Sequence, residues 1–240
     1  MIPLYFKIYQ QIKDDIRDHT YPAGSFLPSE NELVTQFQTS RDTIRKALAK
    51  LDEEGLIQKQ RGKGSQVISH QLRHFPISGL TSFHELEELQ HFHVVTEVPV
   101  FEHLTVTKKT QKTTLFPVGT PLYHIVRVRI IDGIYSVIDE DYIRADIVPG
   151  LTKDIAKHSI YAYIENTLHL SVAYAEKTIT AELVTAMDRK LLVGLPEDEN
   201  RLIQVESQGH LTDTTYFQRT IARHRPDQFQ FNEFARRQTT

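Results

Sequence analysis

The sequence predicts an α+β protein with an N-terminal winged helix-turn-helix, residues 1–70, and a C-terminal antiparallel-sheet domain, residues 71–240. Three observations predict it. A capped short helix is followed closely by a helix with a basic outer face, a Gly-rich basic hairpin comes next, and the remainder alternates strand-like and helix-like segments joined too tightly for parallel crossovers. With 240 residues, 40% of them hydrophobic, the chain can form two ordinary domains.

The first helix is expected over residues 4–20. Apolar side chains recur there at four-residue spacing, at Leu4, Ile8, Ile12 and Ile16. This spacing places them on one face of a helix, so they are predicted to pack in a core.

The second helix is expected to begin after Ser29. Ser29 and Glu32 have the spacing of a capping box, in which each side chain accepts a hydrogen bond from the other residue's backbone amide. Gln38 and Thr39 then offer a short turn before Ser40, a second N-cap candidate. The apolar residues predicted to face inward are Leu33, Val34 and Phe37.

The third helix, expected over residues 41–54, has two distinct faces. Its apolar stripe is Ile44, Ala47, Leu48 and Leu51, and its outer stripe is Arg41, Asp42, Arg45, Lys46 and Ala49. A helix of this kind fits the major groove of DNA, where an arginine binds guanine in bidentate fashion. Arg41 and Arg45 are therefore predicted to contact bases, with the hydroxyls of Ser40 and Thr43 on phosphates.

A hairpin is expected after the helix stop at Gly55. Residues 56–60 and 65–68 are the predicted strands, and its tip is Arg61, Gly62, Lys63 and Gly64. The glycines allow close approach to a backbone, and Arg61 and Lys63 can neutralise phosphates. Each of these features alone also fits a solvated surface or a plain hairpin, but their order within one compact run favours DNA binding.

The charge distribution agrees with a protein that touches DNA at one end. The net charge is −3, yet residues 40–70 hold seven Lys and Arg against four Asp and Glu. No apolar run has the length of a membrane span and no signal sequence is evident, so a cytoplasmic protein is expected. The absence of cysteine excludes disulfides and thiolate metal ligands.

Seven strands and three helices are expected in the C-terminal part. The predicted strands are 94–106, 123–131, 134–143, 172–182, 202–210, 216–224 and 229–234. The predicted helices are 82–90, 159–168 and 185–192, with Ser159 and Thr185 as N-caps and Asp188 completing a box-like pattern.

The predicted hairpin around Asp132 and Gly133 suggests a ligand site. A three-residue loop, Ile131 to Gly133, would place Arg127 opposite Val137 and would gather the polar residues on one face: Tyr123, Arg127, Arg129, Tyr135 and Asp139. Arg127 and Arg129 suit a phosphate, and Asp139 suits sugar hydroxyls. The alternative is that both arginines line a solvent face and pair with Asp139 or Asp141. A second anion element is expected at a helix start formed by Thr81, Ser82, Phe83 and His84.

Three further interpretations remain open. His91 and His93 could supply two metal ligands, but no third partner is evident, and neither a metal nor a cofactor is expected. An enzyme tethered to DNA would need an acid or base such as Asp139, Glu140 or Tyr161, although signatures such as a phosphate-binding loop or a nucleophile elbow are missing. A DNA binder without an effector is the third possibility.

The N-terminal segment resembles the winged helix-turn-helix of GntR-family bacterial transcription regulators. The matching residues are Leu27 to Glu30, Ser40, Arg41, Thr43, Ile44, Arg45, Ala47, Leu48, Glu54 to Ile57, Gly62 and Gly64. Gln38 and Thr39 depart from it, since the family usually has Gly and Val there. The resemblance implies that Asn31, Ser40, Arg41, Thr43, Arg45 and residues 61–63 contact DNA.

The C-terminal part resembles the UTRA effector domain of the HutC subfamily, whose sheet is similar to that of chorismate lyase. It is most similar to trehalose-responsive members in residues 75–83, 151–163 and 223–236. The resemblance implies a phosphate held by Ser82, Phe83, Arg127 and Arg129, and a sugar facing Asp139, Ser159 and Tyr161. It also implies a homodimeric repressor of a sugar-utilisation operon, released from a palindromic operator by trehalose 6-phosphate.

Overall fold

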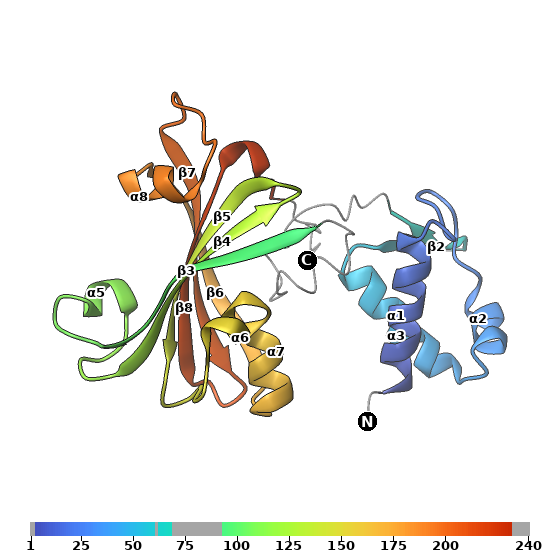
Figure 1. Cartoon of the computed structure of the whole chain (residues 1–240). Coiled ribbons are helices and arrows are strands. Elements are labelled where there is room, and N and C mark those ends of the chain that lie inside the picture. Colours follow the sequence, from blue (N-terminus) through green and yellow to red (C-terminus); the bar gives the residue numbers. More distant parts are fainter. Residues whose placement is uncertain (1–2, 61, 69–92, 232–240) are drawn as a thin grey trace, which may run out of the picture. The chain divides into compact units, whose positions relative to one another are not determined.

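The computed structural model describes residues 3–60, 62–68 and 93–231, which form two compact units. Residues up to 68 belong to the first unit and residues from 93 to the second, and each is described by itself (Figure 1). The helix expected over residues 82–90 lies outside the described residues. None of the helices in the described part of the chain is both long and apolar enough to cross a membrane.

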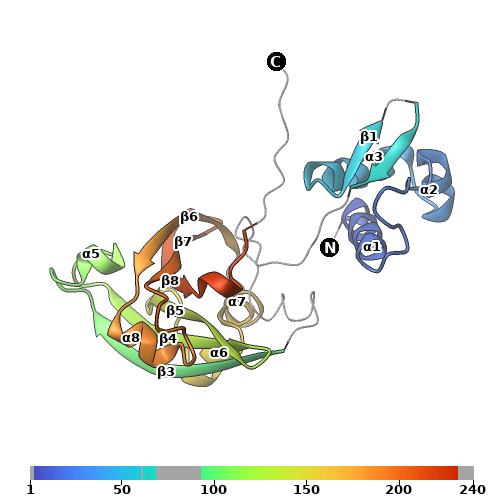
Figure 2. The ribbon, with the colours of Figure 1, turned by 90° about the horizontal axis from the view of Figure 1, so that it is seen from above.

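In its described residues, the first unit contains three helices and a two-stranded hairpin (Figure 2). The helices are α1 (Leu4–Arg17), α2 (Glu30–Gln36) and α3 (Arg41–Glu53), and the antiparallel strands are β1 (Ile57–Gln60) and β2 (Gly64–Val67). One apolar core joins all of them, with Ile12, Leu33, Ile44 and Leu51 almost fully buried. This arrangement confirms the winged helix-turn-helix.

The ends of these helices follow the expected caps with two differences. Ser29 and Glu32 form the capping box, and the Ser40 side chain accepts from the Thr43 amide. Helix α1, however, ends at Arg17 and not at residue 20. Leu4, expected in the core, is 53% exposed and is the first residue of α1.

The second unit is built on one antiparallel sheet of six strands, in the order β3-β4-β5-β8-β7-β6. Its strands are β3 (Val94–Thr105), β4 (Pro121–Ile131), β5 (Ile134–Arg144), β6 (Val172–Leu183), β7 (Arg201–Leu211) and β8 (Tyr216–His224). Six of the seven expected strands are thus confirmed, as is the α+β class. The expected strand over 229–234 is wrong for residues 229–231, which follow the 3-10 helix η2 (Pro226–Gln228) without sheet pairing.

Short helices cover both faces of this sheet (Figure 1). On one face lie α6 (Lys153–Lys157), α7 (Ile160–Ala162) and a π-helical turn η1 (Tyr163–Thr167); on the other lie α5 (Gln111–Thr114) and α8 (Ala186–Leu191). The helix expected over 159–168 is therefore two short elements, α7 and η1. Helices α5 and α6 are too short to show a helical period in the sequence.

The face under α6 and α7, here called the inner face, has an apolar core at one end. Ile125, Ile143 and Phe217 from the sheet pack there against Ile160 and Ile164. The opposite or outer face has two smaller clusters, one near α5 around Phe116 and one near α8 around Leu192. The inner face beyond its apolar core remains available to polar side chains.

The β4–β5 hairpin differs from its expected register. Its loop has only two residues, Asp132 and Gly133, both with positive φ (48° and 83°), as the commonest two-residue hairpin turns require. A bulge follows at Ser136, so Arg127 lies opposite Asp139 and not Val137. One extra residue in a strand moves every later side chain to the opposite face of the sheet. Beyond the bulge, the polar and apolar side chains of β5 therefore lie on the faces that were expected. Tyr135 precedes the bulge and packs on the outer face instead.

Candidate functional site

The outer surface of α3 presents the basic side chains predicted to read DNA. The side chains of Arg41, Arg45 and Lys46 are 55%, 60% and 61% exposed. Arg45 Nε donates to Glu30 Oε2 at 3.0 Å, and an Arg41 guanidinium nitrogen donates to Asn31 Oδ1. Helix α2 therefore orients both arginines of α3 before any ligand binds. Glu30 was not expected to take part, because its capping position gave no sign of a contact fifteen residues away.

The hydroxyls predicted to contact phosphates lie at the start of α3. Ser40 Oγ is 2.8 Å from Thr43 Oγ1 and also accepts from the Thr43 amide at 3.2 Å. Both side chains thus lie at the positive end of the helix dipole, next to backbone amides that α3 itself leaves unbonded. This end of α3 can accommodate a phosphate.

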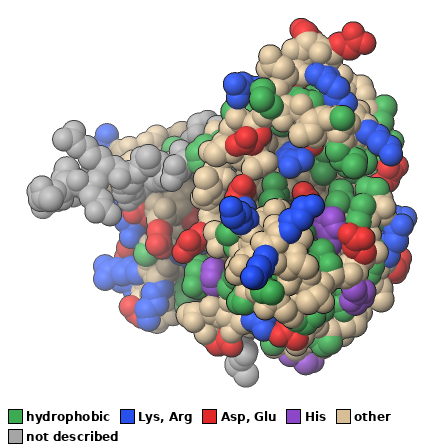
Figure 3. Space-filling view, turned by 90° about the vertical axis from the view of Figure 1, so that its left-hand side faces the viewer, with side chains coloured by type: hydrophobic (Ala, Val, Ile, Leu, Met, Phe, Trp, Pro, Cys, Tyr) green, Lys and Arg blue, Asp and Glu red, His purple; other side chains and the backbone are tan. Residues whose placement is uncertain are grey.

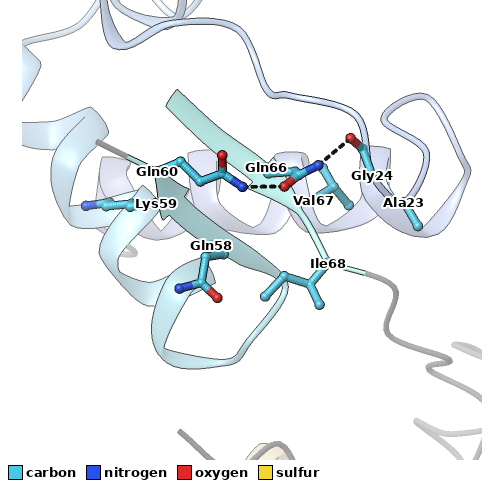
Figure 4. A pocket seen from close by; sticks show the side chains of 8 residues that line it. All are labelled: Ala23, Gly24, Gln58, Lys59, Gln60, Gln66, Val67 and Ile68. Atoms are coloured by element: carbon cyan, nitrogen blue, oxygen red, sulfur yellow. Dashed lines mark hydrogen bonds between the residues drawn. The ribbon is translucent and has the colours of Figure 1, made fainter. Parts of the chain in front are cut away.

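The wing hairpin brings Gly62 and Lys63 to an exposed tip, while Arg61 lies outside the described residues. Gly62 has φ 77°, a conformation that favours glycine. Beside this hairpin is a hollow lined by Ala23, Gly24, Gln58, Lys59, Gln60, Gln66, Val67 and Ile68 (Figure 4). Gln60 Nε2 donates to Gln66 Oε1 at 2.6 Å and Gln66 Nε2 to the Gly24 carbonyl at 2.8 Å, so the carboxamides brace the wing against the preceding loop.

A buried charge network occupies the inner face of the second unit. Arg127 binds Asp141 Oδ2 through Nε at 2.9 Å and through Nη2 at 2.7 Å. Arg129 donates from Nε to Asp139 Oδ2 at 3.0 Å and from Nη1 to Thr96 Oγ1 at 2.7 Å. Arg127 Nη2 is also 3.6 Å from Asp139 Oδ2. The two arginines therefore pair with both carboxylates, but in a buried site rather than on a solvent face.

Asp141 joins three strands in this network. Its other oxygen, Oδ1, accepts from Gln218 Nε2 at 2.9 Å and from Thr220 Oγ1 at 2.7 Å, both on β8. Asp141 is completely buried, and these donors satisfy the carboxylate. It thereby fixes the position of Arg127.

Burial and neighbouring charges shift the pKa values of this network. Burial would lower the pKa of Arg127, but Asp141 and Asp139 outweigh it and raise that pKa. Burial and the nearby Arg127 lower the pKa of Arg129 to about 10, which still leaves it charged at neutral pH. Burial alone would raise the pKa of Asp139, yet Arg129 and Arg127 hold it below its usual value. The site is thus two full ion pairs.

Two neutral groups border these pairs. Burial lowers the pKa of His224 to about 4, although the Asp139 charge acts in the opposite direction. Burial, then the Asp141 charge, raises the pKa of the Tyr161 hydroxyl. Both side chains are therefore uncharged at neutral pH and can exchange hydrogen bonds with a polar ligand.

The expected ligand residues are only partly brought together. Arg127, Arg129 and Asp139 are in direct contact, and Tyr161 from α7 is close enough to interact electrostatically with them. Ser159 Oγ instead accepts from the Ala162 amide at 3.1 Å and caps α7. The expected anion element, Thr81, Ser82, Phe83 and His84, lies outside the described residues. Residues that sequence reasoning missed are Thr96, Gln218, Thr220 and His224, since their approach depends on sheet order.

The outer face carries a separate polar cluster. Glu140, expected as a possible acid or base beside Asp139, points to this face, because adjacent residues in a strand alternate. There it binds His124 Nε2 at 3.0 Å and Tyr142 Oη at 2.6 Å, and His124 Nδ1 lies 2.8 Å from Glu102. Basic and acidic side chains are interspersed on the face that carries α5 and α8 (Figure 3). Asp139 and Glu140 therefore do not form one catalytic set.

No cluster of three or more potential metal ligands occurs among residues 3–60, 62–68 and 93–231. His93, one of the two histidines considered as ligands, is exposed, while His91 lies outside this range. The donor groups of the inner face are two guanidiniums and two carboxylates already paired with them. Such a set suits recognition of a small polar anion rather than metal chemistry.

Two family models match the chain and divide it between them. The model for bacterial regulatory proteins of the gntR family matches residues 4–67, and the UTRA domain model matches residues 89–230. The first range contains α1 to β2, and the second contains the whole sheet. The exposed arginines of α3 and the buried charge network therefore lie within domains that these two family models describe.

Similar proteins extend over nearly the full chain. The HTH-type transcriptional regulator TreR of Bacillus subtilis is 42% identical over 233 residues, 97% of each chain. Among solved structures, the possible transcriptional regulator YydK of B. subtilis has a TM-score of 0.82 with 27% identity, covering 98% of this chain and all of its own. The effector binding domain of the B. subtilis trehalose repressor has a TM-score of 0.54 with 39% identity, covering 60% of this chain and 99% of its own.

TreR and YydK match this chain across both units, and all three of these similar proteins are described as transcriptional regulators or repressors. The tethered-enzyme alternative is therefore wrong. The chain belongs to the GntR family of bacterial regulatory proteins and is a DNA-binding transcriptional regulator with a UTRA effector domain.

Proposed function

We propose that this regulator represses a sugar-utilisation operon for trehalose and leaves its operator when trehalose 6-phosphate binds the second unit. The observation that carries the proposal is the buried pair Arg127 and Arg129 on the inner face. Two guanidiniums held within one site suit a phosphate, which arginine binds through paired hydrogen bonds. The 42% identity to TreR, whose effector binding domain is described as that of the trehalose repressor, supports the choice of trehalose.

The phosphate is proposed to lie against Arg127 and Arg129, with Thr81, Ser82, Phe83 and His84 completing its site. Asp139, Tyr161 and Ser159 would face the sugar. Because Asp139 and Asp141 already neutralise both arginines, an incoming phosphate competes with a carboxylate for guanidinium hydrogen bonds. This competition gives ligand binding a direct means of rearranging β4 and β5.

On the DNA side, Arg41 and Arg45 are proposed to contact base edges, with Lys46 beside them on the exposed surface of α3. Asn31, Ser40 and Thr43 would contact phosphates or hold the arginines, and the wing residues Arg61, Gly62 and Lys63 would follow the backbone. A single helix reads only a few base pairs, so a homodimer on a palindromic operator in the cytoplasm is proposed. We place the domain boundary between residues 70 and 71.

Calorimetric titration tests the effector assignment. Trehalose 6-phosphate should bind the wild-type protein, whereas trehalose without its phosphate should bind at least tenfold more weakly, because bonds to charged groups are among the stronger ones. The Arg127→Ala variant should lose most of the difference between the two sugars. Equal binding of trehalose and trehalose 6-phosphate by the wild-type protein would overturn the phosphate site.

A further inference from the structure

A strip of polar residues crosses the inner face beyond the arginine pair. Asp141 on β5 lies directly opposite Thr220 on β8, Thr220 opposite Ser207 on β7, and Ser207 opposite Lys177 on β6. None of these pairings lies at a register shift. Residues directly opposite each other project to the same side of a sheet, so all four share the inner face. We call this row the crossing strip.

The rows on either side of the strip include small residues, beside Val205 and Ile179 in one row and Gln218 in the other. Ala222 lies next to it on one side, and Gly209 and Ala175 lie on the other. Thr220, Ser207, Ala222 and Lys177 are only half-buried, in contrast to the fully buried Ile125 and Ile143 beneath α6 and α7. Small side chains and partial exposure leave space above β8, β7 and β6 for a ligand.

A buried acceptor at the edge of the strip needs a donor. Gln218 is 4% exposed, and its Nε2 donates to Asp141 and Thr220, the first two members of the strip. Its Oε1 has no hydrogen-bond partner within the described part of the chain. Since an unpaired buried acceptor costs free energy, its position next to the strip points to a donor that arrives with a ligand, such as a sugar hydroxyl.

The length of the strip indicates the size of that ligand. Three strand spacings separate Asp141 from Lys177, about 14 Å in total. One hexose ring attached to a phosphate at the arginines cannot cover this distance, but two linked rings can approach Lys177. Burial lowers the pKa of Lys177, which agrees with an ammonium placed over the sheet rather than in open solvent.

We propose that the crossing strip is the subsite for the second ring of a disaccharide phosphate, and that Lys177 and Ser207 determine this preference. The inference rests on the proposed function, because it takes the phosphate to lie at Arg127 and Arg129. Lys177 donates to a hydroxyl of the distal ring, and Ser207 supplies a second hydrogen bond. A monosaccharide phosphate fills the arginine end alone and leaves the strip empty.

The experiment compares trehalose 6-phosphate with glucose 6-phosphate by calorimetry in the full-length protein. Lys177→Ala should weaken trehalose 6-phosphate binding about tenfold and leave glucose 6-phosphate binding within about twofold, because only the disaccharide reaches the lysine. Ser207→Ala should also weaken only trehalose 6-phosphate binding, by about threefold. Lys190→Ala, an exposed lysine on α8 at the outer face, is the matched control and should change neither affinity.

Each outcome decides the proposal. An equal loss for both sugar phosphates in Lys177→Ala would show that the lysine only attracts anions at long range, and the subsite would be wrong. Equal affinity of the wild-type protein for the two ligands would also overturn it. If glucose 6-phosphate does not bind detectably, the second ring is essential, and the decision rests on the loss of trehalose 6-phosphate affinity in Lys177→Ala relative to Lys190→Ala. A wild-type protein that binds neither ligand would refute the proposed effector itself.

Discussion

Among individual residues, Gln38 shows how a departure from the family pattern is accommodated. Its φ is 47°, in the left-handed region, at the turn between α2 and α3. A residue with a β-carbon is strained there by about 1–2 kcal/mol, whereas glycine is not. The turn therefore keeps a backbone conformation that glycine adopts easily. Having glutamine there in place of glycine strains the backbone but does not change its conformation.

Gln38→Gly should stabilise the first unit. The relief of about 1–2 kcal/mol outweighs the backbone entropy cost of glycine, roughly 0.5–1 kcal/mol, so a net gain of up to about 1.5 kcal/mol is expected. Urea unfolding followed by circular dichroism measures it. Gln36→Gly, within α2, is the control and should destabilise; a loss of stability in Gln38→Gly as well would contradict the strain argument.

His124 gives the outer face a dependence on pH. The hydrogen bond to Glu140 raises its pKa, burial opposes this, and Glu102 adds to the increase. Because the pKa of His124 is higher in the folded protein than the unfolded value of about 6.5, its protonation stabilises the fold. This stabilisation is fully present below about pH 6.5 and is lost as the pH rises through the folded-state pKa.

The melting temperature of the wild type should therefore exceed that of His124→Gln by more near pH 6 than near pH 9. Differential scanning calorimetry at both values measures this difference. His158→Gln, an exposed histidine that follows α6, serves as the control. A difference between wild type and His124→Gln that is constant with pH would rule out the charged His124 bridge.

Single residues were predictable where the sequence pattern is local. The caps at Ser29, Ser40 and Thr185 depend on neighbours within three residues, and all three were confirmed. Glu30, Gln218 and Thr220 could not be predicted as site residues, because their partners come from other elements whose approach depends on packing.

At the level of elements, strands with alternating apolar residues were predicted closely, and β8 has the expected bounds. The β4–β5 register was wrong because a two-residue turn and a bulge at Ser136 together give the same separation of faces as a three-residue loop. The alternation pattern in the sequence cannot distinguish these two arrangements. The hairpin nevertheless delivers Arg127 and Arg129 to one face, as expected.

The short helices were harder to predict for a different reason. Helix α6 has five residues and α5 has four, so neither presents a full apolar stripe. They form because the sheet provides apolar surface to cover. The π-helical turn η1 likewise depends on that packing and has no local signature.

The capping box of α2 should affect both the stability of the first unit and the position of the exposed arginines of α3. Ser29→Ala removes the acceptor of the Glu32 amide and should cost about 1 kcal/mol of stability. It should also weaken operator binding, because α2 holds Arg41 and Arg45 through Asn31 and Glu30. Chemical unfolding and fluorescence anisotropy measure the two effects. Gln36→Ala, exposed on the same helix, should change both only slightly; wild-type stability and affinity in Ser29→Ala would contradict this role.

On the scale of the whole molecule, we propose separate tasks for the exposed arginines of α3 and the buried arginines of the sheet. Exposure suits groups that must reach a duplex, whereas burial with matched carboxylates suits groups that must hold one small anion in a fixed place. For release, the ligand must bind the arrangement that cannot hold DNA more tightly than the one that can.

The two tasks should be separable by mutation. Arg45→Ala should lose about 1–3 kcal/mol of operator affinity and most of the preference for operator over random duplex, since one base contact is removed. Calorimetry should show unchanged binding of trehalose 6-phosphate. Lys153→Ala, an exposed lysine of the second unit, controls for the loss of one positive charge. Retained selectivity in Arg45→Ala would refute the base contact.

The central claim is that a sugar phosphate at the buried arginine pair releases DNA held by α3. Fluorescence anisotropy of the labelled duplex upstream of the protein's own gene tests it, with trehalose 6-phosphate added to the preformed complex. The wild-type protein should dissociate as the ligand is added, and Arg127→Ala should bind the duplex equally well but remain bound. Release of Arg127→Ala at the same ligand concentration, or no release of the wild type, would contradict the claim.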